Sequence, residues 1–221
     1  PLDPSESHAA LVQARRLAQV TQAILDGRAR EMNREIQVNP IQPPHLLAGR
    51  LVDRWLAASA GDWNRALAPT ATDGDALTRI LGGYYRALIL EHRRQYDQAD
   101  AQYRQLLLDG TAAEMTRLPY GEFLERRGRS VEAVALYDAG LAQGADPMLL
   151  AARERAATRG RPPALLSIRE GAALALSHAA AAAALSDAHE FVIAYLRMSL
   201  TLDPAKGEAW LMLGDALNEI G

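Results

Sequence analysis

The residues that could carry out acid–base or metal chemistry are scattered along this chain. His178 and His189 are 11 residues apart, but Ser186–Asp187 is typical of a turn, which would separate them. The chain has no cysteine, which excludes disulfides, thiol catalysis and cysteine metal sites. It also lacks the phosphate-binding, dinucleotide-binding, zinc-protease and serine-nucleophile patterns. We therefore expect no catalytic residues, no metal and no cofactor. The five histidines are His8, His45, His92, His178 and His189.

Two charged stretches stand out, "EHRR" at 91–94 and "EFLERRGR" at 122–129. Arginines at the end of a helix interact favourably with its dipole, so a structural explanation is sufficient. The interleaved glutamates cancel the positive field that nucleic acid would require. The net charge of −3 points the same way. We expect no nucleic-acid partner.

The elements that carry these residues should be helices. Alternating β-branched runs are missing, and Ala, Leu, Arg, Glu and Gln dominate. The most apolar run, "GAALALSHAAAAAALS", is too short and too rich in alanine to span a bilayer, so we expect no membrane insertion. Within it, alanines 179–184 predict a tightly packed, buried helix.

Small and aromatic residues recur at a fixed spacing. Ala99 and Ala133 are 34 residues apart, as are Tyr103 and Tyr137. Expected turn residues keep the same period: Gly27, Gly61, Arg94 and Gly128 follow one another at intervals of 34, 33 and 34. A period of this length indicates stacked helical hairpins.

One interval breaks the period. Gly128 and the next expected turn residue, Asp187, are 59 apart, which is one repeat plus 25 residues. We expect the additional segment at 145–163, with a helix that begins at Pro147 and a break at Pro162–Pro163. The predicted division is residues 1–144 (about four repeats, the first two irregular), 145–163 (the additional helix and break) and 164–221 (a further repeat and the first helix of an incomplete one).

The last repeat resembles the tetratricopeptide repeat family. Trp210, Leu213 and Gly214 match that family's W-x-x-L-G, and Pro204 matches its closing proline. The resemblance implies an all-α, right-handed superhelical solenoid of antiparallel helix pairs. It also implies close helix packing at small residues such as Gly121 and Gly214. Earlier repeats depart from the pattern: the tryptophan position holds Arg16, Arg50, Gly83 and Arg117, and Arg54 replaces a small residue.

The same resemblance implies a concave groove, lined by the first helices, that holds a peptide or a partner helix. Trp55 and Tyr84 could supply aromatic anchors for such a partner, and ordinary packing between repeats is the alternative, favoured for Tyr84. One subtype of the family binds a C-terminal carboxylate with lysine and asparagine side chains. This chain has Leu51, Tyr84 and Leu118 at the positions of the lysine, and Trp55, Leu88 and Glu122 at the positions of the asparagine, so that activity is not expected. The groove candidates are Trp55, Tyr84, Leu88, Glu91, Glu122, Glu125, Arg126, Asp215 and Asn218.

Residues 205–221 are typical of a first helix whose partner helix does not follow. Trp210, Leu213 and Leu217 should then be partly uncovered and could form a homodimer edge. A capping helix is the alternative, although caps usually carry a polar outer face.

The sequence therefore predicts a non-enzymatic protein–protein interaction scaffold. A looser resemblance, carried by "IREGAALALSHAAAAAALS" and "AYLRMSLTLDP", is to the Arg/Ala/Leu-rich repeat proteins of proteobacteria, many of them exported. It leaves open an accessory protein for envelope assembly or secretion, and it favours the periplasm or another exported location over the cytoplasm. The remaining alternative is the accessory repeat region of a larger enzyme.

Overall fold

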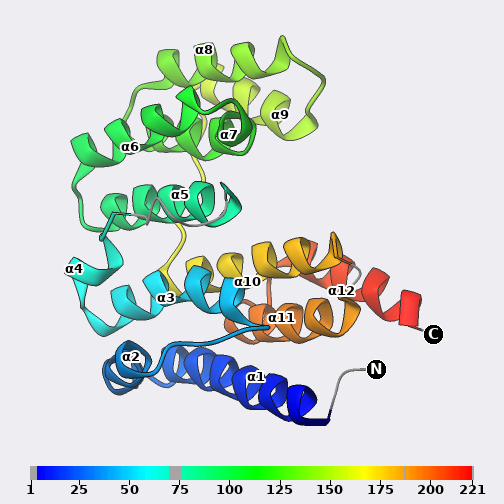
Figure 1. The fold of residues 1–221 in the computed structure, drawn as a ribbon. Coiled ribbons are helices and arrows are strands. Elements are labelled where there is room, and N and C mark those ends of the chain that lie inside the picture. The colour runs from blue at the N-terminus through cyan, green and yellow to red at the C-terminus, as the bar shows by residue number, and fades with distance from the viewer. Residues whose placement is uncertain (1–3, 70–75, 187, 221) are drawn as a thin grey trace. The chain divides into compact units, whose positions relative to one another are not determined.

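In the computed structural model, which describes residues 4–69, 76–186 and 188–220, every regular element is an α-helix (Figure 1). The all-α prediction is confirmed. None of the helices in these ranges is both long enough and apolar enough to cross a membrane. In chain order the helices are α1 (Pro4–Leu25), α2 (Ala29–Val38), α3 (Leu46–Ala60), α4 (Trp63–Ala66), α5 (Ala76–His92), α6 (Tyr96–Leu108), α7 (Gly110–Arg126), α8 (Ser130–Leu141), α9 (Pro147–Ala157), α10 (Ile168–Ala184), α11 (His189–Leu202) and α12 (Gly207–Ile220).

Each periodic turn residue lies between the two helices of one hairpin. Gly27, Gly61 and Gly128 have φ angles of 71°, 79° and 74°, and Arg94 has a φ of 57°. This left-handed conformation is the usual way to end a helix sharply, and glycine adopts it without strain. The four predicted turns are confirmed. The expected turn residue Asp187 and the last residue, Gly221, lie outside the described residues.

The additional segment contains the predicted helix, α9. It begins at Pro147, and the Asp146 carboxylate caps it by accepting hydrogen bonds from the Met148 and Leu149 amides at 2.8 and 3.2 Å. After α9, Arg159 has a φ of 54°, as at the turn of a hairpin. The extended stretch that contains Pro162 follows, where a hairpin would have its second helix. The segment is thus the first half of a hairpin.

The chain divides into two compact units. Helices α1–α4 combine with α10–α12 in a discontinuous unit, and residues Arg79–Leu165, which carry α6–α9 and α5 except for its first three residues, form an inserted unit. This division differs from the predicted one because α10 packs along α3, and α11 packs beside α1 and α10, as Figure 1 shows. Within the discontinuous unit, packing therefore skips from the second hairpin to α10, past five helices of the chain.

Small residues on α10 permit its close packing. A Cβ atom on Gly171 would lie 2.5 Å from Cζ2 of Trp55, so only glycine leaves room for the indole ring on α3. On the side of α11, the Ser199 hydroxyl donates to the Ala173 carbonyl at 2.8 Å and lies 2.9 Å from the Ser177 hydroxyl. These contacts fix α10 between two neighbouring helices.

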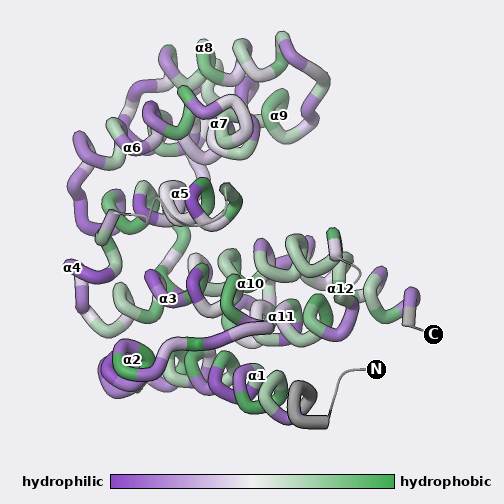
Figure 2. Tube along the Cα trace, viewed as in Figure 1, coloured by the Kyte–Doolittle hydropathy of each residue, from purple (hydrophilic) through white to green (hydrophobic). Residues whose placement is uncertain are grey.

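The expected burial of the whole alanine run is only partly correct. Ala179 and Ala180 are buried, but Ala181 and Ala184 are exposed, because the buried part of α10 is centred earlier, at Gly171–Ala180. Figure 2 shows α10 and α11 as largely hydrophobic along their lengths, in contrast to the mostly hydrophilic α2. Helix α10 is thus a central helix of the discontinuous unit rather than one defined by its alanine run.

The other predicted close approaches give a mixed result. Ala99 and Ala133 are fully buried. A Cβ on Gly121 would overlap the ring of Tyr137, which confirms the need for glycine there, although a ring rather than a backbone fills the space. Gly214 has no atom within 4 Å of an added Cβ, so the expected close approach at this position is wrong.

Arg54, which replaces the small residue of the repeat pattern, has a structural explanation. Its guanidinium donates to the carbonyls of Ala66 and Ala68 at 2.9 and 2.7 Å. Ala66 is the last residue of the single-turn helix α4 and Ala68 lies just beyond it, where carbonyl groups lack partners within the helix. The irregular second hairpin is thus closed by a side chain from its own first helix.

Candidate functional site

The predicted groove residues are divided between the two units. Trp55 belongs to the discontinuous unit and is fully buried against Gly171, so its side chain offers no surface to a partner. Of the two expectations for Trp55, packing is the correct one. Asp215 and Asn218 lie exposed on α12 of the same unit.

The remaining six candidates all belong to the inserted unit, on its first helices α5 and α7. Tyr84 and Leu88 of α5 are 8% and 3% exposed, so they too are interior residues. The charged candidates are Glu91 on α5 and Glu122, Glu125 and Arg126 on α7. The structure brings these four together.

Two bidentate ion pairs join neighbouring first helices. Arg126 donates from Nε and Nη2 to the two carboxylate oxygens of Glu91, at 2.7 and 2.9 Å, and so joins α7 to α5. Arg155 of α9 donates in the same manner to Glu125, at 3.0 and 2.8 Å, and so joins α9 to α7. Paired N–H···O bonds of this kind are stronger and more directional than single ones. Together with Glu122, these residues form what we call the polar cluster: Glu91, Glu122, Glu125, Arg126 and Arg155.

Glu122 is the surplus carboxylate of the polar cluster. The cluster contains three glutamates and two arginines, and both arginines bind the other two glutamates bidentately. The closest ion-pair contact of Glu122 is to Arg155 at 3.9 Å, and its side chain remains 24% exposed. Partial burial raises the pKa of Glu122 above the usual value, against the opposing effect of Arg126 and Arg155. When all its members are ionised, the cluster carries one net negative charge.

Two equivalent tyrosines lie behind the polar cluster and differ in their hydrogen bonds. Tyr137 of α8 donates its hydroxyl to Glu125 Oε1 at 2.7 Å. Tyr103 of α6 lies 34 residues earlier, and Glu91 lies 34 residues before Glu125, so the two pairs correspond. The Tyr103 hydroxyl is nonetheless buried without a hydrogen-bond partner among the described residues.

The Tyr103 hydroxyl faces the polar cluster. Burial raises the pKa of Tyr103 well above the usual value, and the residue also interacts electrostatically with Tyr84 and with Glu91, Arg126 and Glu122 of the cluster. Sequence reasoning noted Tyr103 and Tyr137 as repeat markers without a functional role and missed Arg155 altogether. The available signal was the predicted helix that begins at Pro147, because Arg155 lies in its last turn.

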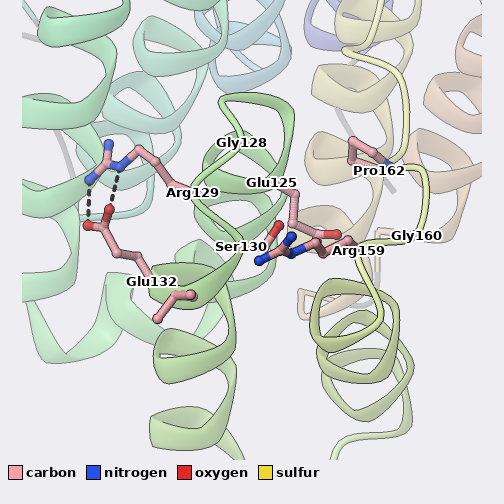
Figure 3. Close-up of a pocket in the computed structure, with 9 residues that line it drawn as sticks. Glu125, Gly128, Arg129, Ser130, Glu132, Arg159, Gly160 and Pro162 are labelled. Atoms are coloured by element: carbon pink, nitrogen blue, oxygen red, sulfur yellow. Dashed lines mark hydrogen bonds and ion pairs between the residues drawn. The ribbon is translucent and has the colours of Figure 1, made fainter.

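A pocket of about 690 Å³ opens beside Glu125, between the α7–α8 turn and the segment after α9 (Figure 3). Arg129 lies on the rim of this pocket, and its guanidinium already forms ion pairs with Asp100 at 2.7 Å and Glu132 at 2.7 Å. Arg159 extends into the pocket from the α9 side, next to Ser130. Carboxylate, guanidinium and hydroxyl groups line it, so it suits hydrogen bonding with a polar ligand. Its lining is Glu125, Gly128, Arg129, Ser130, Val131, Glu132, Arg159, Gly160 and Pro162.

The predicted homodimer edge on α12 is partly exposed. Trp210 and Leu217 are 55% and 44% exposed, and the Trp210 indole N–H donates to the Pro204 carbonyl at 2.9 Å. Leu213 is 6% exposed, so the expectation that it is uncovered is wrong, because it faces inward on a helix that packs against α11.

The histidines do not form a metal site in the part of the chain that the structure describes. His189 lies 3.0 Å from a Glu219 carboxylate oxygen. His45 is buried, with Nδ1 2.7 Å from the Tyr195 hydroxyl. Burial, and secondarily Lys206, lowers the pKa of His178 to about 4, which keeps this side chain neutral.

Comparison of the chain with protein-family models, with curated proteins and with solved structures finds no match.

Proposed function

We propose that this chain is a non-enzymatic scaffold for protein–protein interactions. In this proposal its helical hairpins follow the tetratricopeptide plan, including the right-handed superhelical arrangement, and a partner's peptide or helix binds along first helices. The recurring left-handed turns at Gly27, Gly61, Arg94 and Gly128 support the plan.

One observation supports the location of binding. The first helices α5, α7 and α9 of the inserted unit bring the polar cluster together, and a polar pocket opens at Glu125 beside it. Charged groups cost free energy to remove from water, so a cluster held by bidentate pairs and left with a surplus carboxylate is expensive for stability alone. Recognition of a partner gives such a cluster a use.

Site-specific photo-crosslinking tests this proposal. A photoreactive amino acid at Arg159, exposed on the pocket, should crosslink one partner protein in extract of the source organism. The control is the same amino acid at Leu108, which is 80% exposed at the end of α6. The same partner captured equally from both positions, or none from position 159, would contradict the proposal.

A further inference from the structure

The inserted unit contains an internal comparison that shows what the polar cluster lacks. In the α7–α8 hairpin, Glu125 accepts from both Arg155 of the next first helix and Tyr137 of its own hairpin. In the α5–α6 hairpin, Glu91 accepts from Arg126, but the equivalent Tyr103 donates to no described group.

A buried hydroxyl without a partner is costly, so the Tyr103 position calls for a further hydrogen-bonding group. That group must also suit the charge nearby. Both arginines of the cluster are held bidentately, whereas Glu122 is a partly exposed carboxylate with only a long contact to Arg155. An anion would be repelled by the surplus negative charge, and a cation would neutralise it.

The shape of the missing cation follows from the acceptors. Glu122 and the Tyr103 oxygen come from different helices, so a group that binds both must donate in more than one direction, whereas the paired donors of a guanidinium suit a single carboxylate. An ammonium group is compact, has three donors and no acceptor, and stands on a slender four-carbon stem. Such a stem can carry the charge past the exposed edge of Glu122 towards a buried hydroxyl.

We propose that the polar cluster and the Tyr103 hydroxyl bind the ammonium group of a lysine side chain on the partner protein. This inference rests on the proposed scaffold function and specifies the chemistry of its partner. The lysine donates to the Glu122 carboxylate and the Tyr103 oxygen, and its charge balances the surplus carboxylate.

The test titrates the full chain with capped tripeptides, acetyl-Ala-X-Ala-amide, in which X is lysine, arginine, Nε-acetyl-lysine or glutamine. Nuclear magnetic resonance follows the Tyr103 ring and Glu122 side chain. The lysine peptide should shift these signals with the lowest Kd, and the acetyl-lysine and glutamine peptides should leave them unchanged. Equal binding of lysine and acetyl-lysine peptides, or no shift with lysine at millimolar concentration, would overturn the inference.

Two variants separate recognition from folding. Glu122→Gln should raise the Kd for the lysine peptide at least about tenfold, as the loss of a charged hydrogen-bonding partner predicts. The control Glu114→Gln removes the same charge from an exposed position on the same helix and should leave the Kd unchanged. Tyr103→Phe should raise the Kd severalfold while thermal stability stays equal or increases, because it removes a buried hydroxyl that has no partner. An unchanged Kd in Tyr103→Phe would count against the site.

The two proposals can fail separately. If photo-crosslinking captures a partner and the lysine peptide does not bind, lysine recognition is wrong and the scaffold stands. If no partner is captured from position 159, the scaffold proposal is contradicted whatever the peptide does.

Discussion

Replacing Gly121 with alanine tests the packing of the inserted unit most directly. A Cβ atom at this position would overlap ring atoms of Tyr137 and lie 2.5 Å from its hydroxyl oxygen. Tyr137 is fully buried, so its ring has no free space to move into. Its hydroxyl also donates to Glu125, so displacement of the ring breaks that bond.

The magnitude follows from three contributions. Overpacking costs about 1–3 kcal/mol, and a lost hydrogen bond to a charged group costs about 1.5–3 kcal/mol. Alanine is the better helix former by about 1 kcal/mol, which offsets part of the loss. The expected net destabilisation is about 1.5–5 kcal/mol. Gly214→Ala on α12 is the matched control, because nothing lies within 4 Å of its added Cβ and only the gain in helix propensity applies.

Hydrogen exchange measured by mass spectrometry is the appropriate assay. All three tryptophans lie in the discontinuous unit, so tryptophan fluorescence would not report on the inserted one. Gly121→Ala should accelerate exchange of the protected amides in α7 and α8 by about tenfold or more, since each 1.4 kcal/mol is a factor of ten. Unchanged or slower exchange in these helices would refute the inferred packing of Tyr137 against Gly121.

Three further predictions concern the discontinuous unit. Gly171→Ala should destabilise it by about 1–3 kcal/mol, because the new Cβ meets the Trp55 ring; urea unfolding followed by tryptophan fluorescence measures this, and no loss would contradict the packing. Ser167→Ala removes the side-chain half of a capping box and should cost about 1 kcal/mol in the same assay; an unchanged midpoint would argue against the cap. His178 has a folded-state pKa of about 4, below the unfolded value, so the unfolded state binds more protons and stability should fall as pH drops from about 6.5 to about 4. The loss should approach about 3 kcal/mol and be reduced in His178→Gln; equal pH profiles of the two proteins would refute it.

The local structure could be predicted from the sequence because it depends on local chemistry. Left-handed turns at Gly27, Gly61 and Gly128 follow from the conformational freedom of glycine. Pro147 after Asp146 indicates a helix start in any context. The hairpin period joined these signals, so even Arg94, a poor residue for positive φ, was correctly placed at a turn.

The packing order in the discontinuous unit could not be predicted from the sequence. Repeats with similar apolar helix faces can pack against more than one neighbour, and the repeat pattern does not specify which one. The contact between Trp55 and Gly171 joins positions separated by the whole inserted unit. Trp55 on an amphipathic helix was equally compatible with a groove or with a core. The outcome depended on a glycine in a distant segment, whose significance appears only when α10 lies beside α3.

The polar cluster shows a further limit of repeat logic. Equal spacing placed Tyr103 and Tyr137 at equivalent positions, and both are fully buried, so the packing obeys the period. Their hydrogen bonds do not, because Glu125 accepts from its own hairpin's tyrosine as well as from the next first helix, whereas Glu91 binds Arg126 and leaves Tyr103 unpartnered. Periodicity fixes where these side chains lie, but it does not fix which hydrogen bonds they form. The Tyr103 hydroxyl, which departs from the period by having no hydrogen-bond partner among the described residues, faces the same cluster that contains Glu122, the carboxylate without a bidentate arginine.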